Sequence, residues 1–341
     1  MAANAAVAPA RRSMAARVVT TVGRSRELTL FGVMVVLSLV VTVRAPQFLS
    51  PSNLTEVTTM AAIMAIAAVG EALVIITKNV DLSVESTIGL TAFVVADILS
   101  QHTLSVPEAW AAGLALGLVL GMANGAVITL FRLPSIVVTL GTLSIYRGLA
   151  FFVAGGREMN LAQMPAGYSN PSSQTFFGIP LFVLVAVAVV VVVALLLRLT
   201  PFGRHLYAVG SNAEAASVIG IRSRVTVFLA FSLCGLLAGM AGVLWGMEFG
   251  TIYATSASGI VLQIVAAVVV GGVMISGGSG TVVGAALGAL FLGLINNALL
   301  LLLMPQELLQ AIYGVVILIA VSADAILQRR ERRIAAETTI R

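Results

Sequence analysis

The chain has 341 residues, of which 59% are hydrophobic and 10% are charged, and its mean hydropathy is +1.07. Soluble domains are about 45–50% apolar and about 25% charged, so this composition excludes an ordinary soluble globular protein. The net charge of +5 comes from loops and tails, which indicates membrane topology rather than nucleic-acid binding.

Apolar runs recur along the whole chain and predict an all-α, polytopic transmembrane bundle of eight to ten spans, with ten favoured. Several runs approach or exceed the roughly 18 residues of a spanning helix, and lipid requires that backbone groups be paired within each segment. The third and eighth spans are short and rich in small or polar residues, so we expect them to be tilted, broken or re-entrant. The predicted spans are residues 28–43, 57–77, 84–100, 109–131, 134–154, 179–199, 225–247, 261–276, 281–303 and 309–327.

The basic residues orient these spans. With a cytoplasmic N-terminus, 16 of the 19 Lys and Arg side chains lie on the cytoplasmic side, as the positive-inside rule favours. Residues 1–27 and 328–341 are then basic cytoplasmic tails, and residues 28–327 form one transmembrane domain. The polar loop 200–224 is expected in the cytoplasm.

Two segments interrupt apolar helices in a similar way. Residues 76–90 contain a short polar break, residues 270–287 contain a glycine-rich one, and a run of small residues follows each. This weak echo indicates either two related halves with broken helices near a pathway or a chance similarity of glycine-rich sequence.

The sequence contains no pattern typical of a catalytic or metal site. There is one cysteine, the two histidines are far apart, and the phosphate-binding pattern GxxxxGK[ST] is absent. We therefore expect no enzymatic activity, no cofactor and no metal. Active transport would need energy from a partner or from an ion gradient.

The loop 200–224 is the longest polar and basic segment between two apolar spans. Ser211 followed three residues later by Glu214 predicts a capping box at a helix start, and Gly220 suits a left-handed residue at the end of that helix. The pattern predicts a helix of about two turns, roughly 12 Å long, whose alanine face could dock in a cleft of a cytoplasmic protein.

Four segments, in order, resemble the ribose, xylose, rhamnose and autoinducer-2 type of ABC importer permease. They read LVIITKNVDLSVES (residues 73–86), NGAVITLFRLPSIVVTLGTLSIYRGLA (124–150), FGRHLYAVGSNAEAASVIGI (202–221) and IVAAVVVGGVMISGGSGTVVGAALGALFLGLINNALLLL (264–302). The resemblance extends over about residues 28–327. Lys78 and Asn79 stand where many members have two glycines, and Glu85 stands where glycine is usual, so the backbone there is expected to differ.

The resemblance implies the permease subunit of a binding-protein-dependent importer in a bacterial plasma (inner) membrane, carrying a monosaccharide or similar polyol. The implied partners are a cytoplasmic ATPase that binds ATP, a periplasmic or lipid-anchored sugar-binding protein, and a second copy or a related permease. The Glu-Ala-Ala-xxx-Gly pattern looks like the family's ATPase-coupling helix. In this chain it comprises Glu214, Ala215, Ala216 and Gly220. The alternatives are a permease for branched-chain amino acids or nucleosides, and an ion-coupled secondary transporter with Glu71 or Asp97 as its ion site.

Polar side chains within or beside the spans are candidates for the pathway. Charges inside a span cost about 2.5–3.5 kcal/mol on insertion scales and are usually paired or face a cavity, so Glu71 and Arg147 either line the route or pair across helices. Asp81, with Ser83, is expected to hold the turn before the third span. Asn296 and Asn297 can bond a sugar-like substrate or neighbouring helices.

Overall fold

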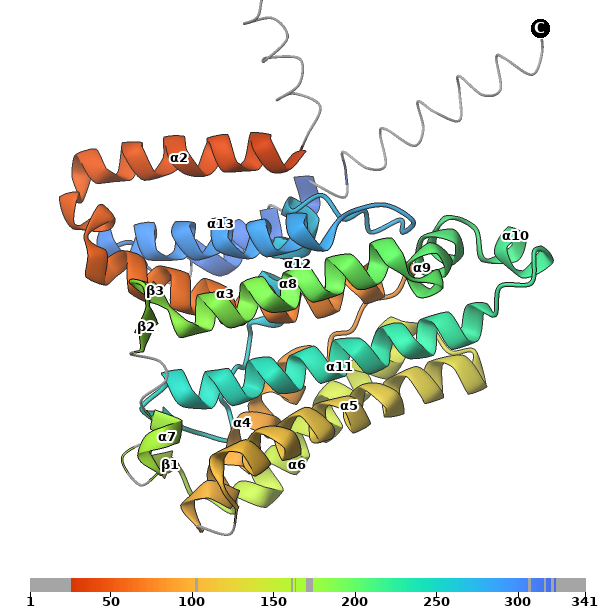
Figure 1. Ribbon diagram of the computed structural model, residues 1–341, viewed down its shortest axis with the longest axis horizontal. Coiled ribbons are helices and arrows are strands. Elements are labelled where there is room, and N and C mark those ends of the chain that lie inside the picture. The colour runs from red at the N-terminus through yellow and green to blue at the C-terminus, as the bar shows by residue number, and fades with distance from the viewer. Residues whose placement is uncertain are drawn as a thin grey trace, which may run out of the picture.

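The computed structural model (Figure 1) describes residues 26–101, 104–160, 162, 164–169, 174–305, 308–315, 317–319 and 322. Long helices lie side by side and nearly antiparallel. We call one end of the bundle the α10 end, where helices α9 and α10 lie, and the other the β4 end, where short strands and α7 lie. The predicted tails, 1–27 and 328–341, fall almost wholly outside the described residues.

The long helices are α2 (Arg26–Arg44), α3 (Pro51–Ile76), α4 (Val84–Ser100), α5 (Val106–Phe131), α6 (Ser135–Ala154), α8 (Leu181–Leu199), α11 (Ser223–Glu248) and α13 (Val282–Leu301). The short ones are η1 (Pro46–Leu49), α7 (Ala166–Ser169), α9 (Pro201–Ser211), α10 (Ala213–Val218) and α12 (Val261–Val270). Strand β1 (Met159–Asn160) pairs antiparallel with β4 (Thr251–Ile252), and β2 (Thr175–Phe176) pairs with β3 (Ile179–Pro180).

The prediction of a polytopic all-α bundle is confirmed. Seven of the described helices are long and apolar enough to cross a membrane. Helix α4 has 17 residues and α12 only 10, so the expectation that the third and eighth spans are short holds. The last predicted span, 309–327, is described only in part, as an apolar helix over Leu308–Ile319. The number of complete spans and the cytoplasmic termini stay predictions.

Helix α3 lies at the centre of the bundle. Of its most apolar window, 94% is buried, against 11% for α2 at the edge. Its buried positions run all round the helix and are rich in alanine, as expected when neighbours pack on every side. Helix α3 is therefore in contact with neighbouring helices on all of its sides.

Helices α5 and α11 pack at close range because small residues face each other. A Cβ atom added at Gly117 would lie 2.3 Å from the carbonyl oxygen of Gly235, and one added at Gly235 would lie 2.3 Å from that of Gly117. Spacings of four residues between glycines in both helices let the backbones touch, as in other membrane helix pairs.

Helix α12 spans only about half of the bundle. Ten residues make about 15 Å of helix, half of a hydrocarbon core of about 30 Å. Its last turn lies beside the first turn of α13, since a Cβ atom at Gly271 would lie 2.2 Å from the carbonyl oxygen of Gly284. The segment 253–260 therefore enters the bundle from the β4 end and meets α12 near mid-depth.

Candidate functional site

The polar loop 200–224 folds into two helices, α9 and α10, rather than the one expected. Asn212, not Ser211, caps α10: its side-chain oxygen accepts hydrogen bonds from the backbone N–H groups of Glu214 and Ala215, both at 3.0 Å. The predicted capping box is thus wrong, because Ser211 is the last residue of α9. Gly220 has a φ of +86°, which confirms the predicted left-handed residue after the helix.

Helix α10 projects at its end of the bundle (Figure 1). Ala216 is buried, whereas Glu214, Ala215 and Gly220 are exposed. At the end of the helix, the side chains of Val218, its last residue, and of Ile219, the residue after it, are also exposed, at 86% and 75%. Large apolar side chains on an otherwise polar tip are typical of a protein contact surface.

Helix α9 joins this tip to both interrupted segments. Gly210 packs so closely that an added Cβ atom would lie 1.8 Å from the carbonyl oxygen of Ile76 and 2.6 Å from the nitrogen of Gly278. Lys78 donates to the carbonyl oxygen of Ser211 at 3.2 Å. Burial raises the pKa of Tyr207, so its phenol stays protonated and donates to the carbonyl oxygen of Gly280 at 2.9 Å.

Lys78 and Glu85, the two departures from the family pattern, adopt different structures. Lys78 has a φ of +65°, a conformation that costs a side-chain-bearing residue energy and that glycine adopts freely. Glu85 lies in the first turn of α4 rather than in the preceding turn. Lys78 thus adopts a conformation that suits glycine, and the expected difference of backbone from the family stays a prediction.

A buried polar network surrounds the turn before α4. The carboxylate of Asp81 accepts hydrogen bonds from the backbone and hydroxyl of Ser83, at 2.9 and 2.6 Å, so this pair holds the turn. Glu71 is fully buried in α3 and accepts from the backbone N–H of Asp81 at 3.0 Å. Asn124 donates to the Ser83 hydroxyl at 2.8 Å, and Tyr146 donates to Asn124 at 3.2 Å. These contacts fit pairing across helices for Glu71.

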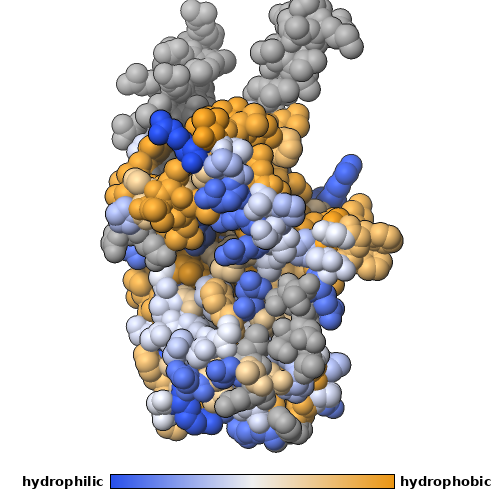
Figure 2. Space-filling model, turned by 90° about the vertical axis from the view of Figure 1, so that its left-hand side faces the viewer, coloured by the Kyte–Doolittle hydropathy of each residue, from blue (hydrophilic) through white to orange (hydrophobic). Residues whose placement is uncertain are grey.

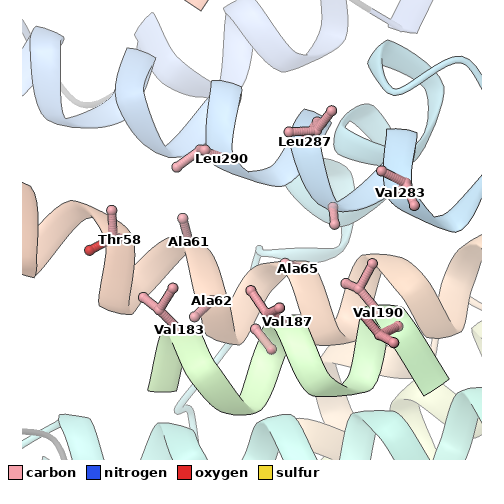
Figure 3. A pocket seen from close by; sticks show the side chains of 13 residues that line it. Thr58, Ala61, Ala62, Ala65, Val183, Val187, Val190, Val283, Leu287 and Leu290 are labelled. Carbon is pink, nitrogen blue, oxygen red and sulfur yellow. The ribbon is translucent and has the colours of Figure 1, made fainter. Parts of the chain in front are cut away.

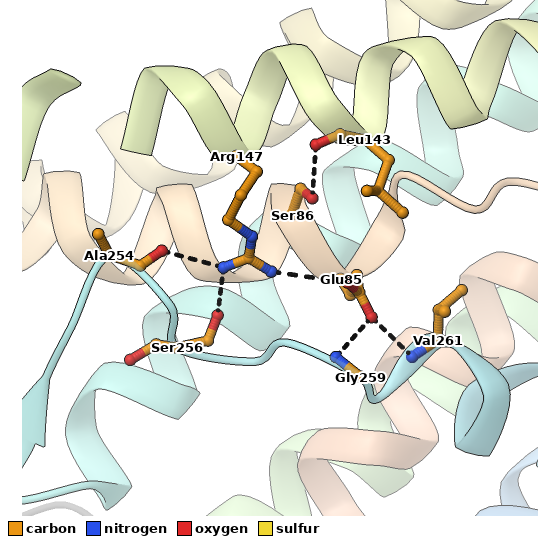
Figure 4. Close-up of polar contacts among 8 residues, drawn as sticks. All are labelled: Glu85, Ser86, Leu143, Arg147, Ala254, Ser256, Gly259 and Val261. Atoms are coloured by element: carbon orange, nitrogen blue, oxygen red, sulfur yellow. Dashed lines mark hydrogen bonds and ion pairs between the residues drawn. The ribbon is translucent and has the colours of Figure 1, made fainter. Parts of the chain in front are cut away.

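Arg147 and Glu85 form a second polar cluster (Figure 4). The guanidinium lies 3.7 Å from the Glu85 carboxylate and donates to the carbonyl oxygens of Ala254 and Ser256 at 3.0 and 2.8 Å. Glu85 also accepts from the backbone N–H groups of Gly259 and Val261 at 2.9 and 3.2 Å. Arg147 therefore holds α6 to the segment that enters the bundle before α12.

The sequence reasoning missed several members of these clusters. Asn124, Tyr146 and the acidic partner of Arg147 come from helices far apart in the chain. The sequence indicates only that a charge inside a span, such as that of Arg147, is usually paired. It does not indicate which residue is the partner.

An apolar groove of about 260 Å³ lies between α3, α8 and α13 (Figure 3). Thr58 brings the one hydroxyl to its wall, and that group already donates to the carbonyl oxygen of Leu54. The other wall residues include Ala61, Val187 and Leu287. Such a groove suits hydrocarbon, and it offers a polar substrate no partners.

A second cavity, also of about 260 Å³, lies among α3, α11, α12 and α13 toward the β4 end, and its mainly apolar wall carries several polar side chains. Figure 2 views this end, where hydrophilic side chains gather over the middle and lower part of the face. Asn296 and Asn297 both line the cavity, but Asn297 is bonded to Asn53 by two amide hydrogen bonds of 2.9 and 2.8 Å. The lining also includes Glu56, Met60, Met64, Trp245, Ile260 and Gln263.

Comparison with known proteins agrees with this architecture. A family model described as the permease component of branched-chain amino acid transport systems matches residues 53–321. The autoinducer 2 import system permease protein LsrC of Salmonella typhimurium is 38% identical over 291 residues, covering 84% of this chain and 83% of that protein. The protein of the same name from Shigella flexneri is 36% identical over 300 residues, covering 88% and 87%. No solved structure matches the chain.

Both the family match and the identities extend over most of the chain, including the two interrupted segments and the loop that carries α10. The chain is therefore a member of this permease family, a multi-pass transport subunit of a bacterial inner-membrane ABC importer of the sugar type.

Proposed function

We propose that this subunit moves a monosaccharide or similar polyol across the membrane with energy from a separate ATPase that docks on α10. The observation that carries the proposal is the exposed tip of α10, with Glu214, Val218 and Ile219 on its surface. The sequence holds no nucleotide-binding pattern of its own. A docked partner would supply both a cover for these apolar side chains and the source of energy.

The charge distribution supports a cytoplasmic position for the α10 end. Arg198, Arg204, Arg222 and Arg224 flank α9 and α10, while Arg44 and Arg157 lie at the ends of helices that reach the β4 end. By the positive-inside rule this distribution supports a cytoplasmic position for α10, and with it the cytoplasmic termini that the sequence predicts. A periplasmic or lipid-anchored binding protein would then deliver substrate to the β4 end.

The closeness of α9 to both interrupted segments supports a mechanical role. A force on α10 would pass through Gly210 to the carbonyl of Ile76 and to Gly278, because these groups are in van der Waals contact. ATP-driven closure of the partner would in this way move α3, α12 and α13 together. Two copies of the chain, or this chain with a related permease, would enclose the pathway.

The polyol class rests on the relatives, which are named as autoinducer 2 import permeases. The family description names branched-chain amino acids instead, which makes an amino acid the second candidate. An ion-coupled carrier receives less support, since Asp97 is paired with Arg157 at 2.9 Å and Glu71 is bonded within the core.

The test is uptake by cells that express the chain with its ATPase and binding protein, using labelled autoinducer 2, D-ribose and L-leucine. We expect uptake of a polyol probe that persists when the ion gradients are collapsed and ATP is maintained. Uptake of leucine alone would overturn the substrate class. Loss of uptake on collapse of the gradients, with ATP unchanged, would overturn the ABC mechanism.

A further inference from the structure

The cavity among α3, α11, α12 and α13 has lining residues from the β4 end to about mid-depth. Glu56 lies in the second turn of α3, and Trp245 lies in the last turn of α11. Met64 lies 13 residues after Pro51, about 20 Å along α3 at 1.5 Å per residue. The cavity therefore lies in the half of the bundle that faces the side from which a binding protein would deliver substrate.

The start of α12 forms the deep part of this cavity. Ile260 precedes the helix and Gln263 lies in its first turn, near mid-depth because α12 is a half-length helix. Transporters commonly place substrate sites beside such interrupted helices near the middle of the membrane. The position is suitable for a site that is reached from the β4 end.

Two amides in the cavity have no hydrogen-bond partner among the described residues: those of Gln263 and Asn296. Asn297, the neighbour of Asn296, is by contrast satisfied by Asn53. Both side chains are half-buried, and each free amide offers both donors and an acceptor to a ligand in the cavity. A ligand with several hydroxyl groups can satisfy both amides.

The remaining wall suits the carbon skeleton of a small ligand. Trp245 stacks on Phe249 with ring centroids 4.5 Å apart, which holds the indole in place as a flat apolar surface. Met60 and Met64 add adaptable apolar side chains. The volume of about 260 Å³ lies just below the roughly 300 Å³ at which pockets for drug-sized ligands begin, so the cavity fits a molecule of monosaccharide size.

The charges of the cavity disfavour an anionic ligand. Glu56 lines it, Glu248 lies close enough to interact with Glu56 electrostatically, and no Lys or Arg among the described residues lines it. A helix start near mid-depth often binds a substrate carboxylate. Here Glu85 already occupies the N–H groups of Gly259 and Val261 at the start of α12. A substrate carboxylate would therefore meet no cationic side chain among the described lining residues and no free N–H at Gly259 or Val261, only the neutral amides of Gln263 and Asn296.

We infer that this cavity is the polyol-binding section of the pathway, in which Gln263 and Asn296 bond the hydroxyl groups and Trp245 supports the carbon skeleton. The inference rests on the proposed function and deepens it: it names the residues that contact substrate and the reason a neutral polyol is chosen over an amino acid.

Uptake in the complete importer tests the role of the amides. Gln263→Ala and Asn296→Ala should each lower uptake of autoinducer 2 or D-ribose at limiting concentration by about tenfold, equivalent to ~1.4 kcal/mol. Association with the ATPase and its basal activity should not change. Gln101→Ala is the matched control, because that exposed amide lies at the β4 end of α4, outside the cavity.

Thiol labelling tests the cavity without relying on uptake. Gln263→Cys should react with a membrane-impermeant maleimide added from the periplasmic side, and autoinducer 2 or D-ribose should slow that reaction. Leu287→Cys, in the apolar groove, should stay unlabelled. The single native cysteine, Cys234, is buried. The unaltered protein should therefore stay unlabelled, and it serves as the blank.

The outcomes separate the two proposals. If the unaltered importer takes up neither polyol, the proposed function fails. If it does take one up while both alanine variants match Gln101→Ala, the cavity assignment alone fails. Labelling of Gln263→Cys that neither polyol slows would also overturn the assignment, whether or not the variants transport.

Discussion

The backbone N–H of Gly278 donates to the carbonyl oxygen of Ile76 at 2.8 Å. This one bond connects the two segments that interrupt helices, since Ile76 ends α3 and Gly278 lies between α12 and α13. Gly210 of α9 packs directly on it. Helix α9, which leads into α10, thus packs directly on the hydrogen bond that connects the two interrupted segments.

A larger side chain at Gly210 should disrupt the contact of α9 with Ile76 and Gly278. We expect Gly210→Val to abolish most uptake while the ATPase still binds, because α10 itself is unchanged and the added atoms would overlap Ile76 and Gly278. Overpacking of this kind costs about 1–3 kcal/mol. Uptake assays with ATPase co-purification check the result.

Gly148→Ala provides the control, since a Cβ atom there meets nothing within 4 Å and alanine favours a helix. Normal uptake by Gly210→Val would show that force does not pass through this contact.

Loss of Glu85 should lower the free energy of unfolding more than loss of Asp97, the acid of the other ion pair. The side chains of Arg147 and Glu85 are only 14% and 9% exposed, and removing one partner of a buried ion pair costs about 3–5 kcal/mol. Glu85→Ala should lower the thermal midpoint in detergent accordingly. Adding Arg147→Met should recover part of that loss, since no charge is then left without a partner.

Asp97→Asn is the control, because its partner Arg157 is 53% exposed, although Asp97 itself is only 15% exposed, and pairs that solvent reaches contribute about 0–1 kcal/mol. Equal losses in Glu85→Ala and Asp97→Asn would contradict a structural role for the Glu85–Arg147 cluster.

The adjacent amides of α13, Asn296 and Asn297, should have different roles, one in uptake and the other in stability. Asn297→Ala should cost about 1 kcal/mol of stability, the scale of hydrogen bonds between membrane helices, and leave uptake per folded molecule unchanged. Asn53→Ala should have the same effect, and the double variant should lose little more. Thermal unfolding and uptake measured on the same membranes check this. Additive losses would mean that the two amides do not depend on each other.

The sequence predicted the helices well because the apolar runs are long and polar breaks separate them. Even the short eighth span was recognisable, since a glycine-rich stretch follows it directly. The predicted cap of α10 is wrong for a local reason: the segment from Pro201 has the composition of a polar loop but forms α9, so Ser211 is the last residue of that helix and Asn212 is the cap.

The site was less predictable, because its contacts join residues far apart in the chain. Nothing near Glu85 in sequence indicates Arg147 as its partner, and nothing near Asn297 indicates Asn53. Trp245 and Gln263 read as ordinary span residues until α11 and α12 are placed beside α3. The dependence on tertiary packing, rather than on local propensity, explains why the candidates from sequence included Asn296 and Asn297 but not the rest of their cavity.

The central claim is that α10 couples the permease to an ATPase, and co-purification of that ATPase with charge-reversed permease tests it most directly. Glu214→Lys should reduce the ATPase recovered with the permease and ATP-dependent uptake together, and Gly220→Leu should do the same because its φ of +86° disfavours a side chain. Glu158→Lys, an exposed reversal at the β4 end, should leave ATPase recovery unchanged. Full ATPase recovery and full uptake in both α10 variants would contradict the account.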